Sequence, residues 1–248
     1  MKRIVIFDKW AVERVKWSSL LAIGEALKKK ELKFSFFNPQ CWDSEKPEAD
    51  LIFTWGFNNF QIQEYYKGKA DIALVDRGFL RRDMDYRYIV LNNRLPQDKP
   101  ADRYETLGVQ RMNGRKPKEA HVLICLQNHH KDWYKQAIGT IKANAPDREI
   151  RVRSFNSDIP LEKDLRGALA VVSFNSTCLY QAIAQGLPVF CDPSCLAASE
   201  GVAETDLSKI EDARVIDASQ FLNNLAYAQW TLKEVQAGDF IEHILGDI

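Results

Sequence analysis

The chain has 248 residues, and its 34 basic and 34 acidic side chains give a formal net charge of zero. Apolar residues make up 46% of the sequence and charged residues 27%, which is typical of an ordinary soluble globular protein. The sequence has no run of 18 apolar residues, which argues against a membrane span, and its N-terminal apolar run is too short for a signal peptide. These features predict a cytoplasmic protein.

The first 95 residues alternate strand-like and helix-like segments. We expect strands at 2–8, 33–37, 50–55, 72–75 and 88–91, with helices at 18–30 and 58–66. Strands that alternate with helices predict parallel βαβ units and a doubly wound sheet. Residues 96–119 then break the pattern with prolines, glycines and many charges, which indicates an interdomain linker.

A second series of the same kind follows the linker. We expect strands at 121–126, 149–155, 170–174, 188–191 and 215–216, and helices at 133–143, 161–169, 178–185 and 219–236. The sequence therefore predicts an α/β protein with two Rossmann-like domains, one at 1–95 and one at 120–248 that ends in a long helix.

We expect the five cysteines to be free thiols that form neither disulfides nor a metal site. Three of them lie inside apolar strand or helix patterns, which favours buried free thiols. Cys191 and Cys195 have the wrong spacing for a zinc site and no second pair accompanies them, so we expect no metal.

The segment from Val171 to Phe190 is the most informative part of the chain. It reads as a buried strand, the polar turn Asn175-Ser176-Thr177, a short helix, a glycine stop and another buried strand. Asn, Ser and Thr are helix N-cap residues, so a helix beginning here would present backbone N–H groups at the carboxyl edge of a parallel sheet. This turn is either an anion site suited to the phosphates of a nucleotide or simply the cap of a structural helix.

Several common catalytic motifs are absent from the sequence. It contains no Walker loop and no Gly-x-Gly-x-x-Gly, which argues against P-loop phosphoryl transfer and ordinary dinucleotide oxidoreductases. It also lacks His-Glu-x-x-His and Gly-x-Ser-x-Gly, the motifs of zinc peptidases and α/β-hydrolases.

The two halves and the turn together resemble a glycosyltransferase of the GT-B fold. The similarity is to capsule-polysaccharide transferase-like proteins and their small phage-encoded, DNA-modifying relatives. It is carried by Asn175-Ser176-Thr177, Gln181-Ala182 and Gly186-Leu-Pro188-Val189, and more weakly by Asp76-Arg77-Gly78. The resemblance implies two Rossmann-like domains that face a cleft, and a reaction without metal or cofactor in which a nucleotide-sugar is the co-substrate.

In GT-B enzymes the C-terminal half holds the donor, which assigns a set of donor-binding candidates to this chain. Ser176 and Thr177 would bind phosphate with hydroxyl and backbone N–H groups. Arg153 is either a phosphate partner or an outward-facing strand residue. The full donor-binding set is Gln127, Arg153, Asn175, Ser176, Thr177, Gln181 and Asp192. His129 and His130 directly follow Gln127 and are either surface loop residues or further donor contacts.

An inverting transfer needs a base to deprotonate the acceptor hydroxyl. Asp8 and Asp76 each end a predicted strand, so either could face the cleft as that base. Asp76 could instead orient Arg77, or the two could form a structural salt bridge. The predicted catalytic residues are therefore Asp8, Asp76 and Arg77.

The N-terminal half would hold the acceptor, and its charge suggests an anionic one. Residues 1–120 carry 23 basic against 17 acidic side chains. Trp10 and Trp17 could stack on sugars or bases, and Arg81 and Arg82 add positive charge. We expect a hydroxyl acceptor such as a hydroxymethylated pyrimidine in double-stranded phage DNA. A capsule-type glycan acceptor and a non-catalytic nucleic-acid-binding protein are the alternatives, and the oligomeric state is open.

Overall fold

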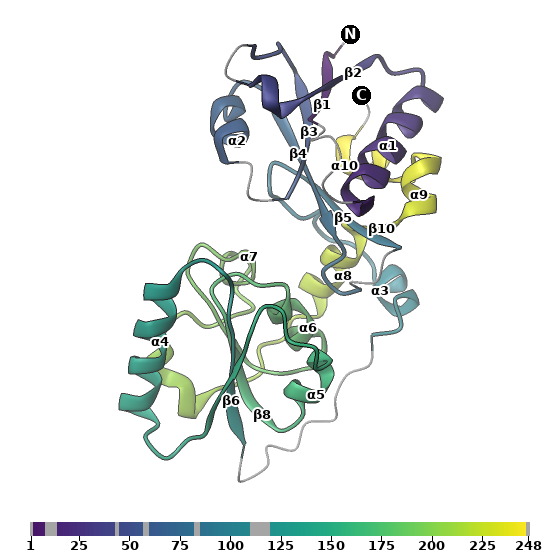
Figure 1. The fold of residues 1–248 in the computed structure, drawn as a ribbon. Helices are drawn as coiled ribbons and strands as arrows, with labels where there is room; N and C mark the ends of the chain where they lie inside the picture. The colour runs from purple at the N-terminus through teal and green to yellow at the C-terminus, as the bar shows by residue number, and fades with distance from the viewer. Residues whose placement is uncertain are drawn as a thin grey trace. The chain divides into compact units, whose positions relative to one another are not determined.

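A computed structural model gives the fold of the chain and describes residues 2–7, 14–42, 45–56, 60–81, 85–109 and 120–246 (Figure 1). The chain forms two compact units. The first contains residues 1–104 together with 223–248, and the second contains residues 105–222. Each unit is an α/β layer structure built on its own sheet.

The first unit is built on a sheet that, within the described residues, has the strand order β10-β5-β4-β3-β1-β2. The strands are β1 (Ile4–Phe7), β2 (Phe34–Phe37), β3 (Leu51–Trp55), β4 (Asp71–Arg77), β5 (Tyr86–Leu91) and β10 (Gln229–Thr231). Strands β1 to β4 are parallel, whereas β5 is antiparallel to both of its neighbours, β4 and β10. The carboxyl ends of β1, β3 and β4 therefore share one edge of the sheet.

Helices cover both faces of this sheet because β1 is apolar at every position. Alternate side chains of a strand point to opposite faces. Ile4 and Ile6 pack in a core with α1 (Arg14–Lys29), α9 (Leu232–Ala237) and α10 (Asp239–Leu245), whereas Val5 and Phe7 pack in a second core with α2 (Phe60–Tyr66). A short 3-10 helix, η1 (Pro39–Cys41), leads into Trp42 of the second core. This is the doubly wound arrangement that the sequence predicts.

The second unit has a parallel sheet with the order β7-β6-β8-β9 within the described residues. The strands are β6 (His121–Cys125), β7 (Ile150–Arg153), β8 (Ala168–Val172) and β9 (Val189–Phe190). The helices are α4 (Lys131–Asn144), α5 (Leu161–Leu165), α6 (Cys178–Ala184), α7 (Leu196–Ser199) and η2 (Leu207–Asp212). Its core joins β6 and β8 to α4 and η2.

The end of the chain differs from the sequence prediction. The helix predicted at 219–236 is divided into α8 (Ser219–Tyr227), β10 and α9, and residues 215–216 form no strand. A capping box between Thr231 and Glu234 starts α9, and β10 pairs with β5 of the first sheet. Residues 223–248 therefore belong to the first unit, so the predicted C-terminal domain at 120–248 is too long.

The predicted linker at 96–119 is also shorter in the structure, since the first unit extends to residue 104. The helix α3 (Asp102–Thr106) lies within it. Arg103 of α3 donates to the carbonyl oxygens of Ala226 (3.1 Å) and Gln229, forms an ion pair with Glu234 (2.8 Å) and lies over the Trp230 ring (4.1 Å to its centre). These contacts hold the start of the linker against the returning C-terminal segment.

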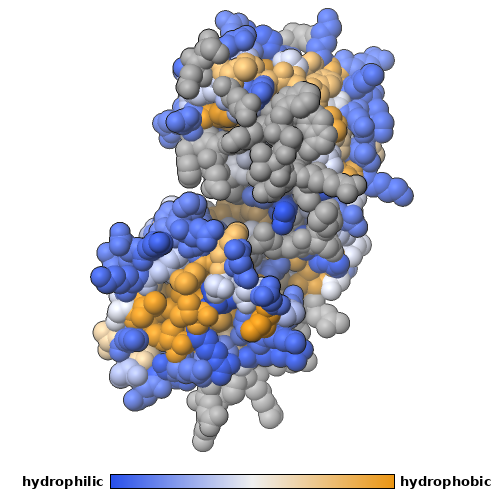
Figure 2. Space-filling view, in the orientation of Figure 1, coloured by the Kyte–Doolittle hydropathy of each residue, from blue (hydrophilic) through white to orange (hydrophobic). Residues whose placement is uncertain are grey.

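The surface is largely polar. Figure 2 shows charged and polar side chains over both units and an apolar area on the second unit. The exposed apolar side chains of that unit include Val152, Phe155 and Ile159, in and after the edge strand β7. Cys41 is exposed, whereas the other four cysteines are buried, and all five are free thiols. Within the described residues, no helix has the length and apolar character that a membrane span needs.

Candidate functional site

The carboxyl edge of the second sheet gathers most of the predicted donor-binding residues. Because β6, β7, β8 and β9 are parallel, the loops that follow them start at one edge of the sheet. Open α/β sheets bind ligands at this edge. The loop after β6 carries Gln127 and His130, the loop after β8 carries Asn175 to Thr177, and the loop after β9 carries Asp192.

A buried hydroxyl joins the ends of β6 and β8. The Tyr134 hydroxyl, on α4, accepts a hydrogen bond from the backbone N–H of Phe174 (3.2 Å). It also lies 3.0 Å from the Cys125 carbonyl oxygen and 3.0 Å from the Ser173 hydroxyl, which itself donates to that carbonyl at 2.6 Å. Burial raises the pKa of Tyr134, so the hydroxyl keeps its proton for this network.

Gln127 connects this network to the predicted polar turn. Its Oε1 atom accepts from the backbone N–H of Asn175 (3.2 Å) and lies 3.3 Å from the Tyr134 hydroxyl. The loop after β9 is tied to the same point, since the backbone N–H of Asp192 donates to the Phe174 carbonyl oxygen (3.1 Å). The structure therefore brings Gln127, Asn175 and Asp192 together through short backbone links. The Gln127 side-chain amide also carries two N–H donors, which are separate from the oxygen used here.

The helix that the sequence predicts after Asn175-Ser176-Thr177 is present as α6. Thr177 is the residue before α6 and has helical φ and ψ of −61° and −18°, without a side-chain capping bond. The Ser176 hydroxyl lies 3.5 Å from the backbone nitrogen of Cys178, so the cap-like contact at the start of α6 comes from Ser176 and not from Thr177. After the helix, Gly186 has a φ of +78°, the left-handed conformation that glycine adopts without steric cost. The predicted strand-turn-helix-glycine unit is thus confirmed as local structure.

An aromatic stack lies beside this turn. His130 has a left-handed φ of 66°, and its ring stacks on Phe174 with 3.6 Å between ring centres and 7° between ring planes. Trp133 meets Phe174 edge-on, with 5.5 Å between the centres. His130 therefore lies at the carboxyl edge of the sheet, where it is exposed and contacts the residue before Asn175. Its role as a donor contact stays a prediction.

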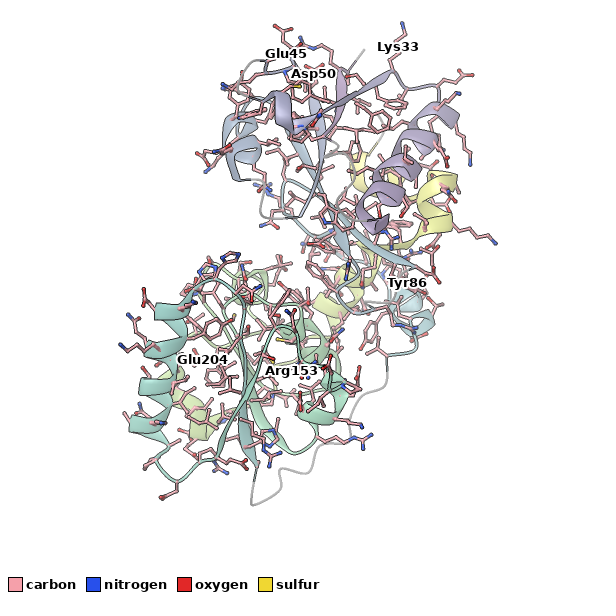
Figure 3. All side chains as sticks on the ribbon, viewed as in Figure 1. Lys33, Glu45, Asp50, Tyr86, Arg153 and Glu204 are labelled. Carbon is pink, nitrogen blue, oxygen red and sulfur yellow. The ribbon has the colours of Figure 1, made fainter. Side chains whose placement is uncertain are left out.

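The other predicted donor residues have partners of their own. Arg153 forms an ion pair with Asp164 of α5, and Figure 3 shows it on the α5 side of the second unit. Asp192 accepts from the backbone N–H (3.0 Å) and hydroxyl (2.6 Å) of Ser194 in a local turn. Gln181 is half-buried on α6. A role of Arg153 in phosphate binding therefore requires it to share its guanidinium with Asp164.

The carboxyl edge of the first sheet carries the predicted catalytic pair. Asp76 and Arg77 are half-buried at the end of β4, and the Asp76 carboxylate accepts from the backbone N–H of Arg77 (2.7 Å). Gly78 follows, and a Cβ atom there would lie 2.0 Å from the Arg81 carbonyl oxygen. This turn therefore requires glycine because the backbone of Arg81 lies too close for a Cβ atom, and not because of the φ of Gly78.

A residue far along the chain supports the same turn. The buried Gln229 side chain, on β10, accepts from the backbone N–H groups of Leu80 (2.8 Å) and Arg81 (3.4 Å). Arg81 itself is exposed and lies over the Tyr86 ring, 5.7 Å from its centre. The remaining predicted residues cannot be placed in the site: Asp8, Trp10 and Arg82 lie outside the described residues, and Trp17 lies in α1 with its side chain outside the described part.

Sequence reasoning missed Tyr134, Ser173 and Gln229. Tyr134 lies on the apolar face of a predicted helix, so its position predicts a core residue. Ser173 is a polar residue that directly ends an apolar strand, which is a usable signal for a group at the carboxyl edge. Gln229 gave no signal, because its partners lie 148 and 149 residues away in the sequence.

Comparison with known proteins identifies the fold. No protein-family model and no curated protein matches the sequence. Two solved structures from Thermosulfurimonas dismutans are similar: KpsC, beta Kdo 2,4 transferase (TM-score 0.56, 11% identity, 90% of each chain covered) and KpsC, beta Kdo 2,7 transferase (TM-score 0.52, 12% identity, 97% of this chain and 99% of that one). The calicheamicin glycosyltransferase CalG4 aligns over 100% of this chain and 99% of its own at 12% identity, with a TM-score of 0.35 that is too low to argue from.

The two KpsC structures confirm the predicted fold class. This chain has the fold of these transferases, with two Rossmann-like domains of the GT-B kind. At 11% and 12% identity the likeness concerns the fold alone. The predicted similarity to small phage-encoded, DNA-modifying enzymes stays a prediction.

Proposed function

We propose that this protein is a metal-independent glycosyltransferase that moves a sugar from a nucleotide-sugar to a hydroxyl group. The observation that carries the proposal is the carboxyl edge of the second sheet. There the Gln127 Oε1 atom lies 3.2 Å from the Asn175 backbone nitrogen, and the Ser176 hydroxyl lies 3.5 Å from the Cys178 backbone nitrogen at the start of α6, in a fold shared with two Kdo transferases.

The donor's phosphate would bind at this edge. The Ser176 and Thr177 hydroxyls and the Gln127 amide N–H₂ are neutral donors, and such donors stabilise the negative charge that develops on a leaving phosphate without a metal ion. The stack of His130 on Phe174 forms one side of the same region. Asp192 would accept a sugar hydroxyl, in exchange for one of its bonds to Ser194.

The transfer itself needs one carboxylate on the first unit. In an inverting reaction this base takes the proton of the acceptor hydroxyl, the acceptor oxygen forms a bond to the anomeric carbon, and the bond from that carbon to the nucleotide phosphate breaks. Asp8 and Asp76 remain the two candidates. The Gly78 turn, which Gln229 holds, would fix the end of β4 at which Asp76 and Arg77 lie.

Two acceptor classes follow from different observations. The two similar structures are named as Kdo transferases, which supports a glycan acceptor. The basic character of residues 1–120 supports hydroxymethylated double-stranded DNA. A mass-spectrometric product screen should therefore offer each donor both acceptors. If Asp76→Asn or Asp8→Asn abolishes formation of a product that the wild type makes, the replaced carboxylate is the base.

Donor binding is tested by thermal stability. A ligand at about 100 times its dissociation constant adds about 2.7 kcal/mol to the free energy of unfolding. UDP-, GDP- and CMP-sugars are titrated against the wild type, against Ser176→Ala/Thr177→Ala, and against Ser35→Ala/Thr140→Ala, a control pair on β2 and in the C-terminal half of α4. We expect one nucleotide class to stabilise the wild type and the control but not the site variant. Stabilisation by none of these donors, or equal stabilisation of all three proteins, contradicts the proposed donor site.

A further inference from the structure

A large groove lies on the first unit at the amino edge of its sheet, the edge opposite the one that carries Asp76 and Arg77. It has a volume of about 1140 Å³, and its walls come from the amino ends of β3 and β4, from α2 with the turn after it, and from the turn after β5. Asp71 and Arg77 are the two ends of β4, so roughly 20 Å of strand separates the groove from the Arg77 end. Figure 3 labels Asp50 on the groove and Tyr86 toward the other end of the unit.

Two carboxylates of the groove are already neutralised by the protein. Asp50 accepts hydrogen bonds from the Arg3 backbone N–H (2.6 Å) and from its guanidinium (3.0 and 3.2 Å), which lowers the pKa of Asp50 to about 2. Asp71 accepts from the Asn92 side-chain amide (3.0 Å) and lies 4.0 Å from the Lys2 ammonium. Neither carboxylate therefore presents an unbalanced negative charge to a ligand.

Apart from Lys2, the positive charges of the groove are not neutralised in the same way. Within the described residues, Lys67 and Arg94 form no ion pair, and both are exposed. Lys69 contacts an aromatic ring instead of a carboxylate, since its ammonium lies 3.8 Å from the centre of the Tyr65 ring. Glu64 is the remaining acidic residue of the lining, so the available charge of the groove is positive.

The wall that carries Arg94 is a tight turn. Asn92 and Asn93 have left-handed φ values of 51° and 55°, and the backbone N–H of Arg94 donates to the Leu91 carbonyl oxygen (3.0 Å). Two consecutive residues with positive φ form the compact two-residue turn that asparagine accommodates well. The Asn92 side chain also accepts from the backbone N–H of Ile72 (2.9 Å), which fastens the turn to β4. Arg94 and the Asn93 amide are therefore presented from a fixed backbone.

The chemistry of the lining favours an acidic carbohydrate over a single-stranded nucleic acid. Ammonium and guanidinium groups bind carboxylates, and side-chain amides bind hydroxyls. Grooves for single-stranded nucleic acid add aromatic side chains on which the bases stack. No aromatic residue is among the residues that line this groove, all of which the structure describes.

We propose that this groove binds an acidic oligosaccharide, with Lys67, Lys69 and Arg94 contacting its carboxylates and Asn93 its hydroxyls. The site is separate from the sheet edge at which transfer is proposed, and its binding requires no catalysis. It gives the first unit a means to hold an acidic glycan chain at a distance from the reacting end.

Isothermal titration calorimetry tests the proposal on the full chain. The acidic probes are α1,4-linked hexagalacturonate and an α2,8-linked sialic acid hexamer, with maltohexaose as the neutral probe and a single-stranded hexadeoxynucleotide as the nucleic acid probe. Lys67→Ala/Arg94→Ala is compared with Lys142→Ala/Arg166→Ala, a pair of exposed residues of the second unit that removes the same charge. Thermal melting of both variants verifies that they fold.

We expect at least one acidic hexamer to bind the wild type and the control alike, and to bind Lys67→Ala/Arg94→Ala about tenfold or more weakly, because charge-assisted hydrogen bonds are lost. Maltohexaose should bind at least tenfold more weakly than that hexamer. The proposal is overturned if neither acidic hexamer binds at millimolar concentration, if both variants bind equally, or if the hexadeoxynucleotide binds as tightly as the acidic hexamers. Donor-induced stabilisation is measured in the same two variants and should be unchanged, so failure here is separate from failure of the proposed transferase.

Discussion

Replacing Tyr134 by Phe removes a single hydroxyl from the network that organises the candidate donor site. The Tyr134 side chain is 4% exposed, so water cannot easily take the place of the lost oxygen. The substitution leaves the ring and its packing in α4 intact. Its effect therefore reports the hydrogen bonds alone.

The structure gives the expected magnitude. The variant loses the bond from the Phe174 N–H and the single hydrogen bond that the hydroxyl proton makes to the Cys125 carbonyl, Ser173 or Gln127. The Cys125 carbonyl keeps the Ser173 hydroxyl at 2.6 Å and remains satisfied. One lost net bond costs about 1 kcal/mol, and a backbone donor left without a partner costs about 1–3 kcal/mol. We expect the second unit to lose at least about 2 kcal/mol, or about 30-fold or more in its unfolding equilibrium.

Hydrogen exchange followed by mass spectrometry on peptides from β6 and β8 measures this unit separately. Tyr65→Phe is the matched control, because the lysine contacts to the ring face do not require the hydroxyl. The control should change protection by less than about 0.5 kcal/mol, as surface substitutions usually do. If Tyr134→Phe shifts exchange no more than the control, the network does not hold these strand ends, and the argument that it positions Gln127 and Asn175 fails.

Three further substitutions test other features. Gly78→Ala should destabilise the first unit by about 1–3 kcal/mol or more, since its Cβ would lie 2.0 Å from the Arg81 carbonyl oxygen. Gly139→Ala is the control in α4, where a Cβ would have nothing within 4 Å, and it should stabilise the protein by about 0.5–1 kcal/mol. Urea unfolding of both variants distinguishes a specific clash at Gly78 from a general effect of replacing glycine by alanine. Burial lowers the pKa of His121, so the folded chain prefers the neutral ring and should lose stability as pH falls through the unfolded value of about 6.5. His121→Gln, which can still donate to the Asp164 carbonyl oxygen, should flatten melting temperature between pH 7 and 5 relative to wild type; an unchanged slope would show that another group titrates.

Much of the fold could be predicted because its strands are apolar on both faces. The predicted strands at 121–126 and 170–174 correspond closely to β6 and β8, which are buried at every position. Parallel βαβ order then places the ends of those strands at one edge, so Gln127 and Asn175 could be placed together before any contact was known. The helix end at Gly186 could also be predicted, because a glycine in the left-handed conformation commonly ends a helix.

Long-range and side-chain geometry could not be predicted in this way. Alternation along its strand left an outward position open for Arg153, but the side chain is half-buried against Asp164, on a helix whose orientation the sequence does not specify. His130 and Phe174 are 44 positions apart, and only the folded sheet brings their rings to 3.6 Å. The apolar spacing of residues 219–236 fits a helix, but the capping box at Thr231 and the pairing of β10 with β5 divide it. Local preference is overridden there by a strand pairing that joins positions about 140 residues apart.

The returning C-terminal segment links the architecture to the candidate chemistry. Its Gln229 carbonyl oxygen accepts from Arg103, which holds the start of the linker, while its side chain accepts from the backbone after Gly78. One residue of β10 therefore contacts both the exit of the first unit and the turn that follows Asp76 and Arg77. A buried glutamine is costly unless its polar atoms are used. Within the described residues, the Gln229 side-chain oxygen is bonded to this turn, whereas its Nε2 atom is buried without a hydrogen-bond partner. The use of its oxygen on the Gly78 turn argues that β10 serves to shape that turn as well as to complete the sheet.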